Sequence, residues 1–173
     1  MPAITERKRL LAATRAAGSS GTLASVFSAA ALAICSKIEE GSAAGGLNGP
    51  SQWLWGEREA YTRRATLRHT AVGYTIHHAT SLGWATLHER VFGQSPARKS
   101  AARHCAEAAT SAAFAYIVDY HFTPSRFRPG FKKHLGPRSI FLVYAAFAGG
   151  LAAAAVLRSD SGEPAAGDSP PLG

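Results

Sequence analysis

Histidine gives this sequence its widest choice of chemistry, because a neutral imidazole can bind a metal or a haem iron and can also carry protons. Four histidines lie at the ends of two weakly apolar segments, which we expect to pair as an antiparallel hairpin centred near residue 96. In that hairpin His69 lies at the depth of His121, and His88 lies at the depth of His104. Two facing pairs could ligate two haems, each iron taking two imidazoles. A haem site also needs a face of small residues, so we favour ordinary interfacial histidines and predict no cofactor.

Two further histidines, His77 and His78, are adjacent in the second apolar segment. The histidine boxes of membrane di-iron oxygenases contain such pairs, but those enzymes need several boxes. This chain has seven histidines in all and one adjacent pair, so we predict no metal site. We expect one of the two to hydrogen-bond another helix, and the other to be packed or to line a polar pocket.

Glu107 and Asp119 are carboxylates inside the third apolar segment, where an ionisable group suggests a path for protons or cations. Each lies within about one turn of an end of that segment. Glu107 follows Arg103 by four residues, and Asp119 precedes His121 by two. We therefore expect local pairing, or, for Asp119, contact with the basic loop that follows the segment.

Other catalytic patterns are missing from the sequence. It contains no nucleotide-binding glycine motif, nucleophile elbow, zinc signature or paired catalytic carboxylates. The two cysteines, Cys35 and Cys105, each fall within an apolar stretch, which favours buried thiols over a disulfide framework. We predict a protein without enzymatic activity and assign no catalytic residue.

The elements that must position these residues are four segments with few charges, at about 16–36, 69–91, 101–122 and 138–158. The first holds 21 consecutive uncharged residues and the fourth holds 19, close to the number of about 20 that an α-helix needs to span hydrocarbon. The second and third are less apolar, and we expect them to insert as a hairpin with their polar groups facing other helices. The sequence thus predicts an all-α fold, a four-helix transmembrane bundle.

Turn-forming residues and charges divide the rest of the chain. We expect a basic N-terminal segment at 1–15, a membrane domain at 16–158 and a disordered tail at 159–173, which is rich in Gly, Pro and acidic residues. Within the membrane domain, a short helix at about 51–64 has Trp and Tyr on one side and charges on the other. We expect that helix to lie in the membrane interface.

The chain of 173 residues has a net charge of +8, which raises the question of nucleic acid. The basic residues do not form one patch. They fall between the apolar segments, at the level where lipid phosphates would lie, so we predict the lipid bilayer as partner and no nucleic acid. A mean hydropathy of −0.04 makes a soluble Ala-rich bundle the competing fold. Segments of 19 to 21 residues without a charge, however, leave no face for water.

The orientation in the membrane follows from the Lys and Arg residues on each side. In the four-helix arrangement, one side carries 9 and the other carries 10, so the two sides tie. We place both termini in the cytoplasm because the basic cluster directly precedes the first helix.

The segments GYTIHHATSLGWATLHERVFG and FLVYAAFAGGL, with the Gly-Pro loop and the Trp-containing segment before them, resemble uncharacterised bacterial inner-membrane proteins of about this length. The resemblance covers residues 20–157 and implies an inner-membrane, multi-pass location without an activity. We predict a structural or accessory membrane component, with another membrane protein or a second copy as further candidate partners. Two alternatives stay open: a haem-binding redox protein and a small proton-coupled transporter.

Overall fold

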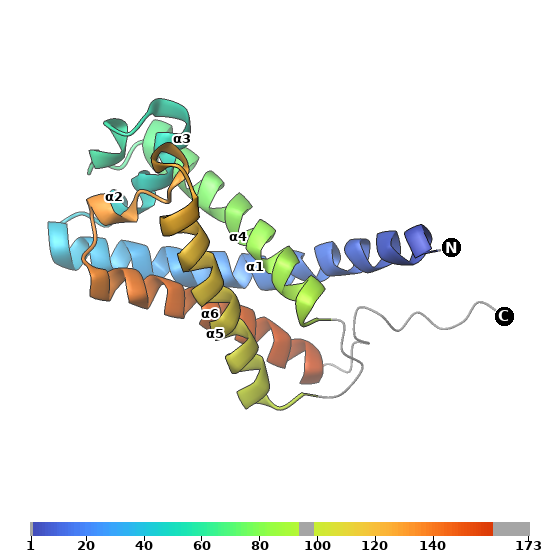
Figure 1. Cartoon of the computed structure of the whole chain (residues 1–173). Helices are drawn as coiled ribbons and strands as arrows, with labels where there is room; N and C mark the ends of the chain where they lie inside the picture. The colour runs from blue at the N-terminus through green and yellow to red at the C-terminus, as the bar shows by residue number, and fades with distance from the viewer. Residues whose placement is uncertain (1, 94–98, 161–173) are drawn as a thin grey trace.

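The computed structural model describes residues 2–93 and 99–160, and within them it contains helices, turns and loops but no strand. Four long helices form the body of the molecule: α1 (Pro2–Glu40), α4 (Val72–Val91), α5 (Ala101–Ile117) and α6 (Pro137–Asp160) (Figure 1). A turn of π-helix precedes α4, at Leu67–Ala71, and another extends α5, at Val118–Phe122. The predicted all-α fold is confirmed.

The first helix is longer than the uncharged segment that predicted it. It has 39 residues, or about 58 Å at 1.5 Å per residue, and it includes most of the basic segment 1–15. Ala, Leu, Arg and Lys are all strong helix formers, so a change from apolar to basic composition does not end a helix. The helix stops before Gly41, whose φ of 75° is easily adopted only without a side chain.

The last helix continues two residues into the segment predicted to be a disordered tail, since α6 ends at Asp160. Residues 161–173, which carry the rest of that prediction, lie outside the described part of the chain.

Successive long helices are antiparallel, and α1 is the central one. It packs along α6 and α4, whereas α5 packs mainly on α6 and makes few contacts with α4 (Figure 1). Two glycines allow the backbones to approach closely. A Cβ on Gly150 of α6 would overlap the backbone of Ala24 in α1, and a Cβ on Gly21 would lie 2.9 Å from the Leu82 side chain of α4. Close approach of this kind is how helices associate where apolar burial supplies little attraction.

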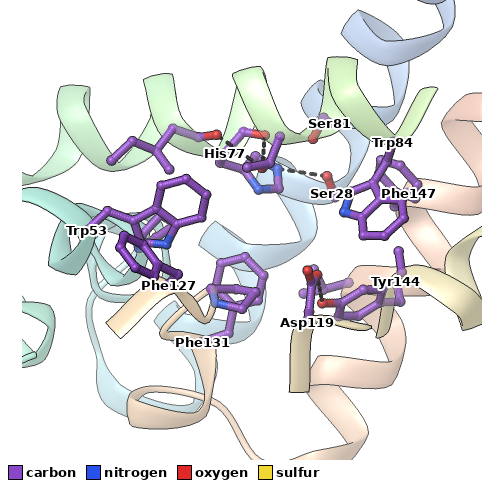
Figure 2. A pocket seen from close by; sticks show the side chains of 16 residues that line it. Ser28, Trp53, His77, Ser81, Trp84, Asp119, Phe127, Phe131, Tyr144 and Phe147 are labelled. Atoms are coloured by element: carbon purple, nitrogen blue, oxygen red, sulfur yellow. Dashed lines mark hydrogen bonds between the residues drawn. The ribbon is translucent and has the colours of Figure 1, made fainter. Parts of the chain in front are cut away.

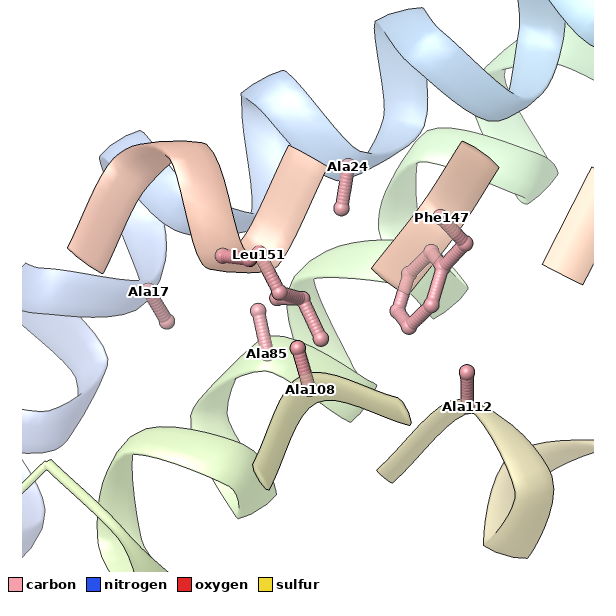
Figure 3. Packing of buried hydrophobic residues seen from close by; sticks show 8 residues of the cluster. Ala17, Ala24, Ala85, Ala108, Ala112, Phe147 and Leu151 are labelled. Carbon is pink, nitrogen blue, oxygen red and sulfur yellow. The ribbon is translucent and has the colours of Figure 1, made fainter. Parts of the chain in front are cut away.

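The core between these helices is built mostly from alanine (Figure 3). Phe147 and Leu151 of α6 are its large members, and small side chains from all four long helices surround them. Those small members are Ala17, Ala24, Ala85, Ala108, Ala112 and Ala152. Because these side chains are small, the helix axes lie close together, and the packing is sensitive to a change in the size of any one of them.

A cap of short helical turns covers the end of the bundle where α1 and α5 finish and α4 and α6 begin. We define the cap as residues 41–66 and 123–136. Its turns are α2 (Ala44–Asn48), η1 (Gly49–Ser51), α3 (Gln52–Trp55), η2 (Glu59–Tyr61), η5 (Ser125–Phe127) and η6 (Phe131–Lys133). The Gln52 amide ties the two stretches together by donating to the Arg128 carbonyl at 2.6 Å.

The cap is anchored to the bundle through His134. One ring nitrogen, Nδ1, lies 2.6 Å from the Glu40 carboxylate at the end of α1, and Nε2 bonds the Ala60 carbonyl. The segment predicted as one interfacial helix at 51–64 is divided instead. Gly56, with a φ of 90°, ends α3 at Trp55, and the chain resumes with the single turn η2.

Two helices of the described chain are long and apolar enough to cross a membrane: residues 6–40 of α1 and 137–159 of α6. The helices α4 and α5 do not meet that measure. Helix length and composition therefore support two candidate spans rather than the predicted four.

Candidate functional site

A cavity lies between α4 and the end of α5, at the half of the bundle nearest the cap (Figure 2). It is lined by side chains of α1, α4, α5, α6 and the cap. The space that it offers to the centres of water-sized molecules is about 50 Å³. A buried water needs roughly 10–15 Å³ on this measure, so the cavity has room for a small polar group.

One wall of the cavity carries the carboxylate of Asp119, which receives a hydrogen bond from Tyr144. The Tyr144 hydroxyl of α6 donates to Oδ2 at 2.6 Å, and Trp84 lines the cavity beside the same carboxylate. Asp119 lies in the π-helical turn that extends α5. Such π-helical turns change the residue spacing of a helix and are frequent at functional sites, which makes Asp119 a candidate.

The opposite wall carries His77 of α4, which bonds Ser28 of α1 across 2.9 Å. The Ser28 hydroxyl also lies within hydrogen-bond distance of the Ala24 carbonyl, at 2.7 Å. The bond between His77 and Ser28 ties α4 to α1 at a position where both are uncharged. It also meets the expectation that one histidine of the adjacent pair bonds another helix.

Aromatic rings make up much of the remaining lining. Trp53 and Phe127 of the cap meet edge to face, with ring centroids 5.7 Å apart. Phe131 lies 5.9 Å from the His77 ring. Trp84 and Tyr144 lie beside the carboxylate, as Figure 2 shows. The cavity is thus lined by six Trp, Tyr and Phe rings among other side chains, and Asp119 is the acidic group among its lining residues.

The second histidine of the adjacent pair, His78, stacks on Tyr74 with ring centroids 6.0 Å apart. Its Nδ1 is buried without a hydrogen-bond partner among the described residues. It is packed rather than placed in the cavity lining.

The four histidines considered for haem each bond a group of another kind. His69 bonds the Glu59 carboxylate at 2.7 Å and also bonds Thr66. The other three bond a hydroxyl or a carbonyl: His88 bonds Ser111, His104 bonds Ser159 and His121 bonds the Ile117 carbonyl. Among the described residues, no group of three or more His, Cys, Asp or Glu side chains could hold a metal ion.

The two carboxylates considered for a proton path lie at different ends of the bundle. Glu107 bonds Lys99 at 2.9 Å and Arg103 at 3.0 Å, so the expected local pairing with Arg103 is confirmed. Asp119 was expected to pair with His121 or the basic loop, and this was wrong. Its carboxylate bonds Tyr144 of α6 instead.

Sequence reasoning did not identify Ser28, Trp84 or Tyr144 as site residues. A single hydroxyl or aromatic residue in an apolar helix gives no signal of its own, and its role depends on the helix that faces it. It also placed Cys105 among buried thiols, whereas Cys105 is exposed and Cys35 is buried.

Comparison of the chain with protein-family models, with curated proteins and with solved structures finds no match.

Proposed function

We propose that the chain is an integral membrane protein, a four-helix bundle in which α1 and α6 cross the bilayer, α4 and α5 pack beside them, and the cap lies at one membrane surface. In this proposal it is a non-enzymatic structural or accessory component. The bilayer is its first partner, and another membrane protein or a second copy would be a further one.

The observation that carries the proposal is the outward apolar surface of the two longest helices. Only 39% of the apolar window of α1 and 44% of that of α6 is buried. Large apolar side chains cover the outer faces, among them Phe27 and Ile34 of α1 and Phe141 and Leu142 of α6. A core helix of a water-soluble protein would bury most of such a window, whereas lipid is the solvent that favours its exposure.

The distribution of charge supports the same arrangement. The uncharged stretch of α1 ends at Arg15 and Lys37, and that of α6 ends at Arg138 and Arg158. Because the two helices are antiparallel, these charges gather at the two ends of the bundle and leave an uncharged belt between them. The belt is about 30 Å tall at 1.5 Å per residue, the thickness of the hydrocarbon layer.

The cap has the composition of a membrane interface, where aromatic rings and long basic side chains are enriched. Two basic groups of the cap, and Arg68 just after its first stretch, lie over aromatic rings. Lys132 is 4.3 Å from the ring centre of Tyr120, Lys133 is 4.9 Å from that of Tyr61, and Arg68 is 4.8 Å from that of Trp55.

The inner membrane of a bacterial cell, with both termini in the cytoplasm, remains part of the proposal. Basic residues number 9 on the side of the termini and 10 on the side of the cap, so charge alone does not decide the orientation. A cleavable reporter at the N-terminus tests it. Protease access from the periplasmic side alone would reverse the assignment.

The transporter alternative would use His77 and Asp119, which line one cavity, rather than Glu107. Substituting Asp119 by Asn and Glu107 by Gln separates the two carboxylates in any uptake assay. The haem alternative would use His69, His88, His104 and His121, of which His69 bonds other side chains through both ring nitrogens. An absorbance spectrum of the purified protein, read for a Soret band, tests it directly.

Membrane extraction tests the main proposal. We expect the chain to stay in the membrane pellet after washing with alkaline carbonate and to enter solution only with detergent. Release by carbonate, together with a monodisperse preparation in buffer without detergent, would contradict it and would favour a soluble bundle.

A further inference from the structure

The cavity has one carboxylate and several aromatic rings in its lining. Both kinds of group attract a positive charge. We propose that the cavity binds the ammonium group of a small organic cation, with Asp119 as the counter-ion and the surrounding rings as the walls. The inference concerns the cavity alone, so it holds whether or not the helices cross a membrane.

The charge of the lining points to a cation. Asp119 is the acidic side chain among the described lining residues, and no Lys or Arg is among them. The Tyr144 hydroxyl that hydrogen-bonds its carboxylate is uncharged, and so is the Trp84 indole beside it. A partly buried carboxylate that is held by a neutral donor is stabilised further by a positive charge.

The one basic side chain in the lining does not supply that charge. Nε2 of His77 is engaged in a hydrogen bond with Ser28 of α1, as the dashed line in Figure 2 shows. Anions are disfavoured in the same cavity, because the carboxylate would repel them.

The walls favour an organic cation over a metal ion. Six of the lining residues are aromatic: Trp53, Trp84, Phe127, Phe131, Tyr144 and Phe147. The face of an aromatic ring attracts a cation, and aromatic enclosures are a common way to bind methylated ammonium groups. A calcium or magnesium ion needs several oxygen ligands, and this lining offers one carboxylate with hydroxyls already directed at backbone carbonyls, such as Thr80 on Ile76.

The size of the cavity limits the ligand. Its volume of about 50 Å³ for water-sized centres corresponds to roughly three to five waters, which suits an ammonium nitrogen with its methyl or methylene groups. The rest of a longer ligand would leave past Phe127, which is the lining residue most open to the surroundings, at 47% exposure.

The position of the cavity allows two sources for the ammonium group. Tyr144 follows Arg138 by six residues, or about 9 Å along the helix. The cavity therefore lies close to the cap surface, within reach of a soluble amine and also of the amine of a lipid headgroup. The shared chemistry is the ammonium group, and the experiment below separates the sources.

The test is a titration of the full chain, purified in a maltoside detergent that carries no ammonium group, with tetramethylammonium chloride. Trp53 and Trp84 line the cavity, so binding should change tryptophan fluorescence in a saturable way, and sodium chloride at the same concentration should not. Choline should bind at least about tenfold more tightly than 3,3-dimethylbutan-1-ol, its uncharged analogue of the same shape. This comparison needs no variant.

Asp119→Asn should weaken choline binding about tenfold or more, because it removes the charge and keeps an oxygen for Tyr144. Glu57→Gln is the control. It removes one negative charge from an exposed position of the cap, outside the cavity lining, and should leave choline binding unchanged. No saturable change with tetramethylammonium, or equal binding of choline and its uncharged analogue, would overturn the proposal. An Asp119→Asn protein that melts like the parent and binds choline equally well would also overturn it.

The source is decided by repeating the titration in phosphatidylglycerol bilayers with and without phosphatidylethanolamine. Competition from the added lipid identifies a headgroup amine as the ligand, and an unchanged titration identifies a soluble amine. Carbonate extraction of the same preparation is an independent readout. Release by carbonate would contradict the membrane proposal even if the chain binds the cation. Failure to bind the cation would contradict the binding proposal even if the chain stays in the membrane.

Discussion

Glu89, near the end of α4, forms an ion pair with Arg158 of α6, with a guanidinium nitrogen 2.5 Å from its carboxylate. The Glu89 side chain is only 2% exposed. Arg158 also reaches Ser19 and the Ala16 carbonyl of α1, so one side chain links three helices. The pair closes the end of the bundle opposite the cap.

Removing the arginine of this pair should destabilise the fold strongly. Arg158→Met leaves the Glu89 carboxylate buried without its cation, which typically costs about 3–5 kcal/mol. We expect a large fall in the melting temperature measured by circular dichroism in detergent, and partial recovery when Glu89→Gln is added. Arg90→Met is the control, because Arg90 pairs with Glu6 on the surface and should cost less than about 1 kcal/mol. Equal effects of the two substitutions would contradict this account of the pair.

A lysine placed on the outer face of α1 distinguishes lipid from water around the helix. Val26 lies at the middle of the uncharged stretch and is 46% exposed. In lipid, Val26→Lys should cost about 2.5–3.5 kcal/mol and lower the fraction of the chain inserted in membranes. In water the same change would be harmless. Ile38→Lys, one residue beyond Lys37 at the end of the stretch, is the matched control and should insert normally. Normal insertion of Val26→Lys would argue against α1 as a span.

His134 should control the attachment of the cap. Its two ring nitrogens bond Glu40 of α1 and the Ala60 carbonyl, and the ring is buried. His134→Leu removes both bonds and leaves their partners buried, so we expect the cap to loosen and tryptic cleavage near Arg58 and Arg63 to accelerate several-fold. His121→Leu should leave the cleavage rate unchanged, since that ring is exposed. A His134→Leu protein as resistant as the parent would show that other contacts hold the cap.

Lys133 of the cap should make stability depend on pH in the alkaline range. Burial lowers the pKa of its ammonium group below the ordinary 10.5, although Glu57 acts to raise it. The unfolded chain therefore binds more protons than the folded chain between the lowered pKa and 10.5, and the contribution of Lys133 to stability rises with pH across that interval.

The comparison that checks this is between the parent and Lys133→Gln, because all other titrating groups are shared. Melting temperatures measured from pH 8 upward should shift in favour of the parent as the pH approaches 10.5, the ordinary lysine value. A difference that stays constant over this range would mean that the folded pKa of Lys133 is not lowered.

Some of this structure could be read directly from local sequence. Runs without charge located the parts of α1 and α6 that pass through the bundle, and the four-residue spacing of Arg103 and Glu107 predicted their ion pair. Both inferences depend on interactions within one helix, which the order of residues determines. The ends of the elements were harder to predict. The charged residues before Ala16 predicted the start of the first helix too late, because α1 begins at Pro2. Gly56 divides the segment 51–64, which was predicted to be one helix.

The sequence by itself determined that this chain is helical and that two of its helices carry long uncharged stretches, because composition and local spacing decide helix formation and charge placement. Only the tertiary structure decided which side chains meet. Asp119 finds Tyr144, and His77 finds Ser28 across 49 positions of sequence. Those contacts depend on how each helix is rotated against its neighbours, and in this protein the rotation is set by close packing of Gly and Ala, residues that carry no chemical signal of their own.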